Sequence, residues 1–369
     1  MMRLTEMQPS EMNLQQRAVW EKIRDPKTYR LKGASSIWIR IPALAEATYD
    51  LMEVLNQTTS VRSQDYHLIP MVVSRRYTVS AMWANHARSA SQKGVSNEVI
   101  EAINQGRMPS FPEEESKITY LMAQALADRE AVPDELFHRA KDLLGQDRIT
   151  EIASIFGAYS MIAILFLCFD RQVPDTGYTL SLDYISPQKR TQEHLTANRM
   201  DPLIPEALNE EQRELYERFA KTHDGKFAGP QVPRLRLPKI SAPVQRINRI
   251  LRSESTLQRQ IFEMITLLVA KAWNAEYMWK AHVRDGIKAG LTEESLLALK
   301  EGRCPEGLSE KERVIIELAQ TLLQFTIPSD ELYQKAFNLL GETQLVEVAS
   351  DVGYYGMAAS MINAFNIMD

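Results

Sequence analysis

The sequence has little cysteine and no strong excess of either charge. Its 369 residues include two cysteines, Cys168 in an apolar run and Cys304 in a loop, and neither belongs to a CxxC motif. Two such cysteines do not make a disulfide framework, so the pattern suits a reducing compartment and we expect the chain in the cytoplasm. A net charge of -5 leaves no electrostatic footprint for nucleic acid, and 44% hydrophobic with 25% charged residues is typical of a globular protein.

Several motifs of well-known chemistry are also missing. The chain contains no GxGxxG, GxxxxGK[ST], HExxH or GxSxG pattern, so nucleotide-binding, zincin and serine-hydrolase functions have no support. The first residues, MMRLTEMQPSEMN, lack the apolar core of a signal peptide, which predicts that the chain is not exported.

The chain matches itself without a gap when it is shifted by 196 positions, from about residue 9 to residue 171. Identical pairs at this offset include Pro9 with Pro205, Met82 with Met278, Trp83 with Trp279, His86 with His282, Gly145 with Gly341, and Gly157 with Gly353. This self-similarity predicts two tandem repeats, residues 1–170 and 204–369. Residues 171–203 have no counterpart and are interpreted as a linker long enough to wrap along a neighbouring part of the chain.

The patterning within each repeat is helical, with apolar residues three and four positions apart and breaks at Pro, Gly and cap residues. In the second repeat we expect helices at about 207–222, 241–253, 256–272, 275–289, 292–301, 309–325, 329–340 and 343–366. Thr292 is a predicted N-cap, and Ser309 with Glu312 forms a capping-box pattern. The residues from Gly33 to Pro42 are the only candidate for extended chain, so the predicted fold class is all-α.

Residues 152–169 form a run of eighteen residues without a charge, the lower length limit for a membrane span. Its counterpart in the second repeat, residues 348–365, contains Asp351 and Asn363, which a helix facing lipid would resist. Repeats related without a gap should share one fold. We therefore expect a buried or interface helix here and no contact with a membrane.

The stretch from Glu263 to His282, EMITLLVAKAWNAEYMWKAH, carries the strongest candidate for chemistry. Helical patterning breaks at Trp273-Asn274, so the two ionisable residues lie at similar distances on either side of the turn in an antiparallel helix pair, about 12 Å from its tip. A carboxylate opposite an imidazole is a plausible proton-transfer pair. Trp279 shares the helix face of His282 and could wall the site, and Tyr277 lies nearby.

The first repeat differs at these positions. It has His67 where the second has Glu263, and Ala81 where the second has Tyr277, whereas Trp83 and His86 are retained. Two interpretations compete: the first repeat is a degenerate scaffold, or it holds a second site in which the imidazoles of His67 and His86 act as acid and base or bind a metal. Two His ligands without a third ligand favour a metal only weakly.

The spacing around Glu263 resembles the alkyl-hydroperoxidase D-like superfamily, in which a Glu is followed by cysteines twelve and fifteen positions later and by a His at nineteen. The motif NAEYxWxxHxxxxxxAGL, starting at residue 274, resembles the carboxymuconolactone decarboxylase branch. Ala275 and Met278 stand at the two cysteine positions. The resemblance implies a helical bundle that forms homo-oligomers, with the two fused repeats related by a pseudo-two-fold axis.

The resemblance also implies a function without a cofactor or a metal. In that branch a small carbonyl-activated carboxylic acid or lactone loses CO2 or is isomerised. His282 would donate or shuttle the proton, and Glu263 would set its tautomer or favour its charged form. The expected substrate-binding residues are Tyr277, Trp279, Met278, His86, Trp83 and His67. A non-catalytic helical ligand-binding or assembly protein is the alternative, and a peroxidase lacks the thiolate that its reaction needs.

Overall fold

The computed structural model describes residues 3–171, 173–181, 195–201, 204–222 and 229–368. Within these ranges the regular elements are helices and no strand occurs, so the predicted all-α class is confirmed. In the first half the α-helices are α1 (Leu14–Ile23), α2 (Ser35–Trp38), α3 (Pro42–Thr58), α4 (Ser63–Tyr77), α5 (Ser80–Gln92), α6 (Asn97–Asn104), α7 (Glu114–Ala127) and α8 (Asp134–Cys168). In the second half they are α9 (Glu210–Thr222), α10 (Gln231–Leu235), α11 (Pro238–Arg249), α12 (Arg259–Ala272), α13 (Glu276–Lys288), α14 (Glu293–Glu301), α15 (Glu310–Leu323) and α16 (Asp330–Phe365). Short 3₁₀ turns (Pro9–Glu11 and Pro205–Ala207) and a π-helical turn, η3 (Ile250–Glu254), complete the set.

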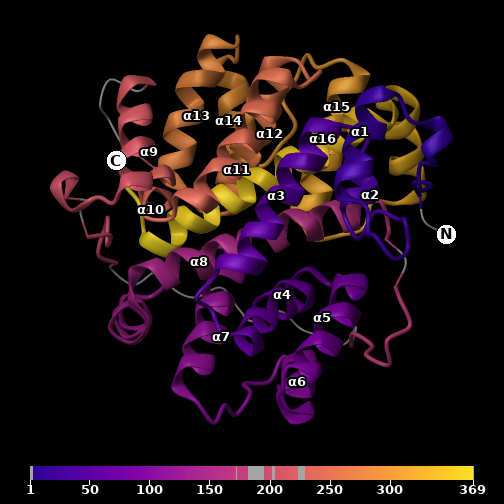
Figure 1. Ribbon diagram of the computed structural model, residues 1–369. Coiled ribbons are helices and arrows are strands. Elements are labelled where there is room, and N and C mark those ends of the chain that lie inside the picture. Colours follow the sequence, from indigo (N-terminus) through magenta and orange to yellow (C-terminus); the bar gives the residue numbers. More distant parts are fainter. Residues whose placement is uncertain (1–2, 172, 182–194, 202–203, 223–228, 369) are drawn as a thin grey trace.

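Two long helices, α8 and α16, pack against each other at the centre of the molecule (Figure 1). Each changes direction at a glycine: Gly145 has φ 75° and ψ 164°, and Gly341 has φ 69° and ψ 178°. Side chains with a Cβ rarely adopt such a conformation, so glycine permits the kink in both helices. The helix break predicted near residue 341 is therefore a kink between two helical segments that follow each other directly.

The two long helices approach most closely at a reciprocal pair of contacts. A Cβ on Gly157 would lie 2.9 Å from the Met357 Cα, and a Cβ on Gly353 would lie 2.8 Å from the Met161 Cα. Real Cβ atoms do not come this close to a neighbouring backbone, so glycine is required on both helices. The arrangement is symmetric: Gly157 lies four residues before Met161, which contacts Gly353, and Gly353 lies four residues before Met357, which contacts Gly157.

The helices around this centre recur at a constant spacing along the chain. Helices α4 to α8 begin 196 residues before α12 to α16, respectively. In space, α4 and α7 pack on α8, whereas α12 and α15 pack on α16, at opposite ends of the view in Figure 1. The first three helices break this separation, because α3 packs against α11 of the second half. Arg246 on α11 pairs there with Asp50 on α3 at 3.2 Å.

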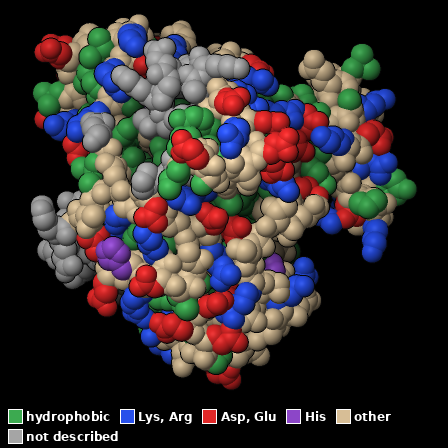
Figure 2. All heavy atoms as spheres, turned by 60° about the vertical axis from the view of Figure 1, so that its left-hand side comes forward, with side chains coloured by type: hydrophobic (Ala, Val, Ile, Leu, Met, Phe, Trp, Pro, Cys, Tyr) green, Lys and Arg blue, Asp and Glu red, His purple; other side chains and the backbone are tan. Residues whose placement is uncertain are grey.

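The apolar run predicted to be buried lies in α8. Among the described residues, this is the one helix long and apolar enough to cross a membrane by length and composition, and 94% of its most apolar window is buried inside the protein. Its partner in that packing is α16. On the face shown in Figure 2, acidic and basic side chains are interspersed, as the small net charge suggests.

One predicted element is wrong. The candidate for extended chain, Gly33 to Pro42, instead contains the short helix α2, and Pro42 starts α3 as its first residue. Proline is favoured at that position because its missing N–H would have no partner in the helix. The predicted caps are confirmed: Thr292 accepts a hydrogen bond from the Ser295 N–H, and Ser309 forms a capping box with Glu312.

The predicted linker falls partly outside the described residues. Its described parts bind to both halves of the protein. The Thr176 hydroxyl donates to the Ala84 carbonyl at 2.8 Å, and the Arg199 backbone N–H donates to the Phe365 carbonyl at 3.1 Å.

Candidate active site

The helix pair α12 and α13 turns where the sequence predicts it. Helix α12 ends at Ala272 and α13 begins at Glu276, with Asn274 in the left-handed region at φ 48°. Asparagine tolerates this conformation better than most residues, which allows a tight reversal. The two helices pack against each other, so positions equally far from the turn face one another.

Glu263 and His282 meet across this pair. The His282 Nδ1 lies 2.7 Å from the Glu263 Oε2, and the exposed fractions of the two residues are 8% and 0%. Arg259, one turn before Glu263 on α12, forms an ion pair with the other carboxylate oxygen. An ionised carboxylate accepts a proton-bearing Nδ1, which leaves Nε2 as the nitrogen available to a ligand.

A second carboxylate lies beside the pair. Ligand atoms of Glu263, His282 and Asp285 all lie within 4.8 Å of one another, a spacing that could hold a metal ion. Burial raises the pKa of Asp285, but its hydrogen bond and charge interaction with Arg252 outweigh this and hold the pKa below its usual value. Arg252 already pairs with Asp285, and Arg259 pairs with Glu263. These guanidinium groups neutralise the carboxylates that a metal ion would need, so we propose no metal here.

His282 lines a small cavity of about 120 Å³. Tyr277 and Met278, two of the predicted substrate-binding residues, line it as well. Tyr355 on α16 adds its ring, which meets the His282 ring edge to face with centroids 5.1 Å apart. Trp279 is not among the residues that line this cavity and packs half-buried against the core instead, so the structure does not bring it to the cavity wall. Three positions on a helix differ in direction by about 60°, which is enough to bring His282 to the cavity and leave Trp279 at its side.

Three polar side chains in this cavity have buried atoms without a hydrogen-bond partner among the described residues: both Nη atoms of Arg234, the Tyr355 hydroxyl and the Gln231 Oε1. Burial lowers the pKa of Arg234, and nearby Tyr354 opposes that change. Burial likewise raises the pKa of Tyr355 well above its usual value, so its hydroxyl remains a donor. Buried polar groups are normally paired, and a cavity with several exceptions is suited to a polar ligand.

The first half holds a corresponding pair of imidazoles. The His67 Nδ1 lies 3.2 Å from the His86 Nδ1, so one of the two nitrogens donates and the other accepts. Burial, together with the charge of His67, lowers the pKa of His86 to about 3, and burial lowers that of His67 too. Both rings are therefore neutral near neutral pH. Trp83 is 1% exposed and, like Trp279, is not among the residues that line the cavity of its half.

His86 lines a cavity of about 280 Å³. His67 is not among its lining residues and reaches it only through His86. Most residues of the two cavities correspond at the offset of 196. The pairs are Ala34 with Pro230, Ser35 with Gln231, Trp38 with Arg234, Met52 with Asn248, Asn56 with Arg252, Met82 with Met278, Asn85 with Ala281, His86 with His282, Tyr159 with Tyr355, Ile162 with Ala358, and Phe166 with Ile362. The cavity of the first half is thus the more apolar version of the same space.

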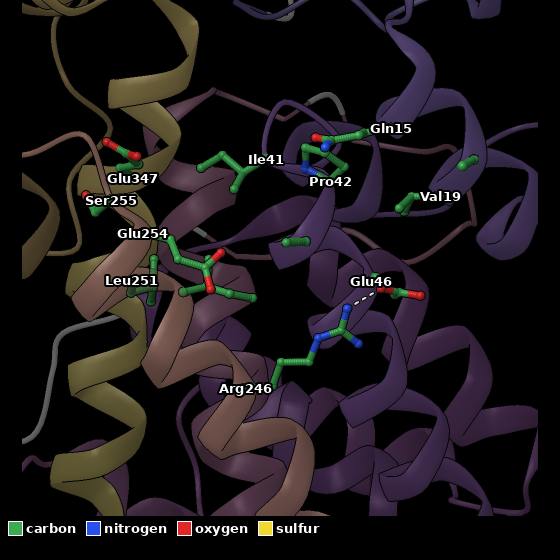
Figure 3. A pocket seen from close by; sticks show the side chains of 13 residues that line it. Gln15, Val19, Ile41, Pro42, Glu46, Arg246, Leu251, Glu254, Ser255 and Glu347 are labelled. Atoms are coloured by element: carbon green, nitrogen blue, oxygen red, sulfur yellow. Dashed lines mark hydrogen bonds and ion pairs between the residues drawn. The ribbon is translucent and has the colours of Figure 1, made fainter.

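A larger cavity, of about 590 Å³, lies between α1, α3, α11 and η3 (Figure 3). Its acidic side chains are already engaged. Glu46 pairs with Arg246 and with Lys22, and Glu347 accepts hydrogen bonds from the Thr256 backbone and hydroxyl. None of its lining residues has a buried polar atom without a partner among the described residues, so size alone singles it out.

Sequence reasoning missed Arg234 and Tyr355. Tyr355 was detectable, because Tyr159 stands at the same place in the first repeat and each tyrosine lies two residues beyond one of the paired glycines, Gly157 and Gly353. In the sequence, Arg234 stands out only when the two repeats are compared, because the first repeat has Trp38 at the corresponding position. A pattern of helical spacing does not reveal that α10 brings this side chain to the α12–α13 pair.

The imidazole pair predicts acid sensitivity. An unfolded His titrates near 6.5, whereas His86 in the folded protein stays neutral down to about pH 3. Between these values the unfolded chain binds a proton that the folded chain does not, so stability falls as the pH falls below about 6.5. We expect His86→Gln to remove a loss of about 2 kcal/mol between pH 6.5 and pH 5.

Urea unfolding at a series of pH values measures this difference. His138, which is exposed, supplies the control, because His138→Gln should leave the pH dependence unchanged. Parallel stability curves for the wild type and His86→Gln would contradict the expectation.

The two cysteines are poorly suited to peroxide reduction. Burial raises the pKa of Cys168 to about 12 and also raises that of Cys304. A thiolate is the reactive species, so both thiols are held in the less reactive form. We expect no turnover of hydroperoxide in the presence of excess dithiothreitol, and turnover that disappears on Cys168→Ala or Cys304→Ala would contradict this.

Comparisons with family models, with curated proteins and with solved structures found no match to this chain.

Proposed function

We propose that the chain is a cofactor-independent proton-transfer enzyme, a decarboxylase or related lyase or isomerase acting on a small carbonyl-activated carboxylic acid or lactone. The observation that carries the proposal is the buried hydrogen bond of 2.7 Å between Glu263 and His282, with His282 lining a cavity. A general acid–base group must reach the reacting atom, and a carboxylate behind an imidazole fixes its tautomer and orientation.

The chemistry of such a site follows from the two groups. In a β-keto acid the bond between the α-carbon and the carboxylate breaks, CO2 leaves, and the bonding electron pair remains as an enolate. The charged imidazole of His282 then gives a proton to that carbon, and water restores the proton. Glu263 accepts a hydrogen bond from Nδ1–H, so that Nε2 carries the proton that is transferred. The Tyr355 hydroxyl can donate a hydrogen bond to the developing oxyanion.

We further propose that the chain is a tandem two-repeat relative of the carboxymuconolactone decarboxylase family, with the repeats related by a pseudo-two-fold axis. Support comes from the constant offset of helices α4 to α8 and α12 to α16 and from the reciprocal contacts of Gly157 and Gly353. The motif around His282 supports the family, and assembly into homo-oligomers remains part of this proposal.

The test is a proton-exchange and decarboxylation screen in D2O. A panel of β-keto acids, β,γ-unsaturated acids and unsaturated lactones is incubated with the purified protein, and NMR follows CO2 loss and deuterium incorporation next to the carbonyl. We expect at least one compound to react with the wild type and not with the His282→Gln variant. Equal background rates for both proteins across the panel would overturn the proposal.

A second candidate is a ligand-binding role for the first half. Its cavity of about 280 Å³ is larger than that of the second half and is walled by Trp38, Tyr159 and Phe166, with His86 kept neutral by burial. An apolar cavity with one neutral imidazole suits an uncharged ligand. Co-crystallisation with small cyclic ketones would place the ligand there, and occupancy confined to the second half would exclude this role.

A further inference from the structure

We infer that the cavity beside His282 binds its ligand through a carboxylate group that is held by the guanidinium of Arg234. This deepens the proposed function by naming the substrate class as a small monoanionic carboxylic acid and Arg234 as its recognition residue. The reaction rests on the proposed function, whereas the binding of the carboxylate follows from the buried side chains alone.

Arg234 is an exception among the buried arginines. It is 1% exposed, and among the described residues its guanidinium pairs with no carboxylate: its Nη atoms meet no hydrogen-bond acceptor in good geometry, and its one polar neighbour is the Tyr354 hydroxyl. By contrast, buried Arg40 donates to the Ser36 carbonyl at 2.7 Å and pairs with Glu342 at 3.0 Å. Burying a guanidinium with only a neutral hydroxyl beside it destabilises a fold, which points to a use for this charge in binding.

The position of Arg234 indicates what that use is. Helix α10 carries Arg234 to the wall of the cavity that His282 and Tyr355 also line. The two terminal nitrogens of a guanidinium match the two oxygens of a carboxylate, and the unpartnered Tyr355 hydroxyl is a further donor in the same space. Because these groups donate and carry positive charge, the complementary ligand is an anion that accepts hydrogen bonds.

The first half provides an internal comparison. There Trp38 stands at the position of Arg234 and donates its ring N–H to the Ser350 hydroxyl at 3.0 Å. The same half has His67 in place of Glu263. The cation and the proton-transfer carboxylate therefore occur together in one half and are absent together from the corresponding positions of the other.

The size and the remaining wall limit the ligand. A cavity of about 120 Å³ has room for roughly four water molecules at about 30 Å³ each. Met278, Ala358 and Ile362 make part of the wall apolar, and the second guanidinium in the wall, that of Arg252, is already paired with Asp285. A short aliphatic acid with one carboxylate fits these walls, whereas the second charge of a dianion would have to compete with Asp285 for Arg252.

The experiment measures binding of butanoate and of its neutral counterpart butanamide by NMR titration of the full chain. The wild type should bind the acid at least tenfold more tightly than the amide. Arg234→Met should reduce butanoate affinity by about tenfold to hundredfold and remove the preference, because a bidentate charge-assisted contact is lost. Arg234→Lys should retain part of the preference, because the charge remains without the fork.

Three controls make the result decisive. The melting temperature of ligand-free Arg234→Met should equal or exceed that of the wild type, and a clear decrease would overturn the inference by assigning Arg234 a structural role. Butanoate has no β-carbonyl group and cannot react, so binding is judged separately from catalysis, and His138→Gln at an exposed position should keep the preference for butanoate. Equal affinity of the wild type for acid and amide, or binding of inorganic phosphate and chloride with no binding of butanoate, would also overturn it.

Discussion

Replacing His282 by alanine is expected to lower turnover of the substrate found in the exchange screen by about 10²–10⁴, the range for loss of a general acid. The reason is geometric. The Glu263 carboxylate binds Nδ1 at 2.7 Å and leaves the opposite nitrogen of the ring for the cavity. Without the imidazole, the carbanion must take its proton from water. Steady-state kinetics of the variant at several pH values measure the loss.

The chain contains its own matched control for that measurement. His86→Ala removes the corresponding imidazole of the first half, where burial keeps the ring neutral, and should leave the rate unchanged within a factor of two to three if the reaction takes place only in the second half. Glu263→Gln should give an intermediate loss and a changed pH profile, because the amide lacks the negative charge and can offer Nδ1 either an acceptor or a donor. Equal rates for the wild type and His282→Ala would remove the basis of the proposed function.

The helix pair and its dyad were predictable because both depend on spacing along the chain. Trp273-Asn274 marks the turn, and equal distances from a turn place Glu263 and His282 opposite each other in any antiparallel pair. The structure adds the burial of both groups and the ion pair with Arg259. These properties depend on which helices cover the pair, and spacing does not specify that.

The wall of the cavity was predicted less well for the same reason. Trp279 precedes His282 by three positions and shares its general side of α13, but a cavity wall is set by contacts with α10 and α16. Arg234 and Tyr355 come from these two helices, which are distant in sequence. The short helix α2 was missed because four residues between Gly33 and Pro42 are too few for a helical pattern to be visible.

Alanine at Gly157 or at Gly353 is expected to lower the free energy of unfolding by about 2–3 kcal/mol, the usual range for overpacking a core. In most helices the exchange of glycine for alanine is stabilising, by up to about 1 kcal/mol. The sign reverses at these two positions because the added Cβ would lie 2.9 Å from the Met357 Cα and 2.8 Å from the Met161 Cα, respectively. A backbone atom cannot rotate away as a side-chain end can, so α8 and α16 must move apart.

Gly356 provides a matched control for this crossing, because it lies on α16 close to Gly353 and a Cβ there would meet only the Trp273 ring, at 3.4 Å. Gly356→Ala should therefore be neutral or slightly stabilising in urea unfolding, and a loss equal to that of Gly353→Ala would show that the close approach is not the cause. The sizes of the two crossing effects carry further information. If the helices cross on a pseudo-two-fold axis, each glycine meets the same backbone environment, and Gly157→Ala and Gly353→Ala must destabilise the protein to a similar extent.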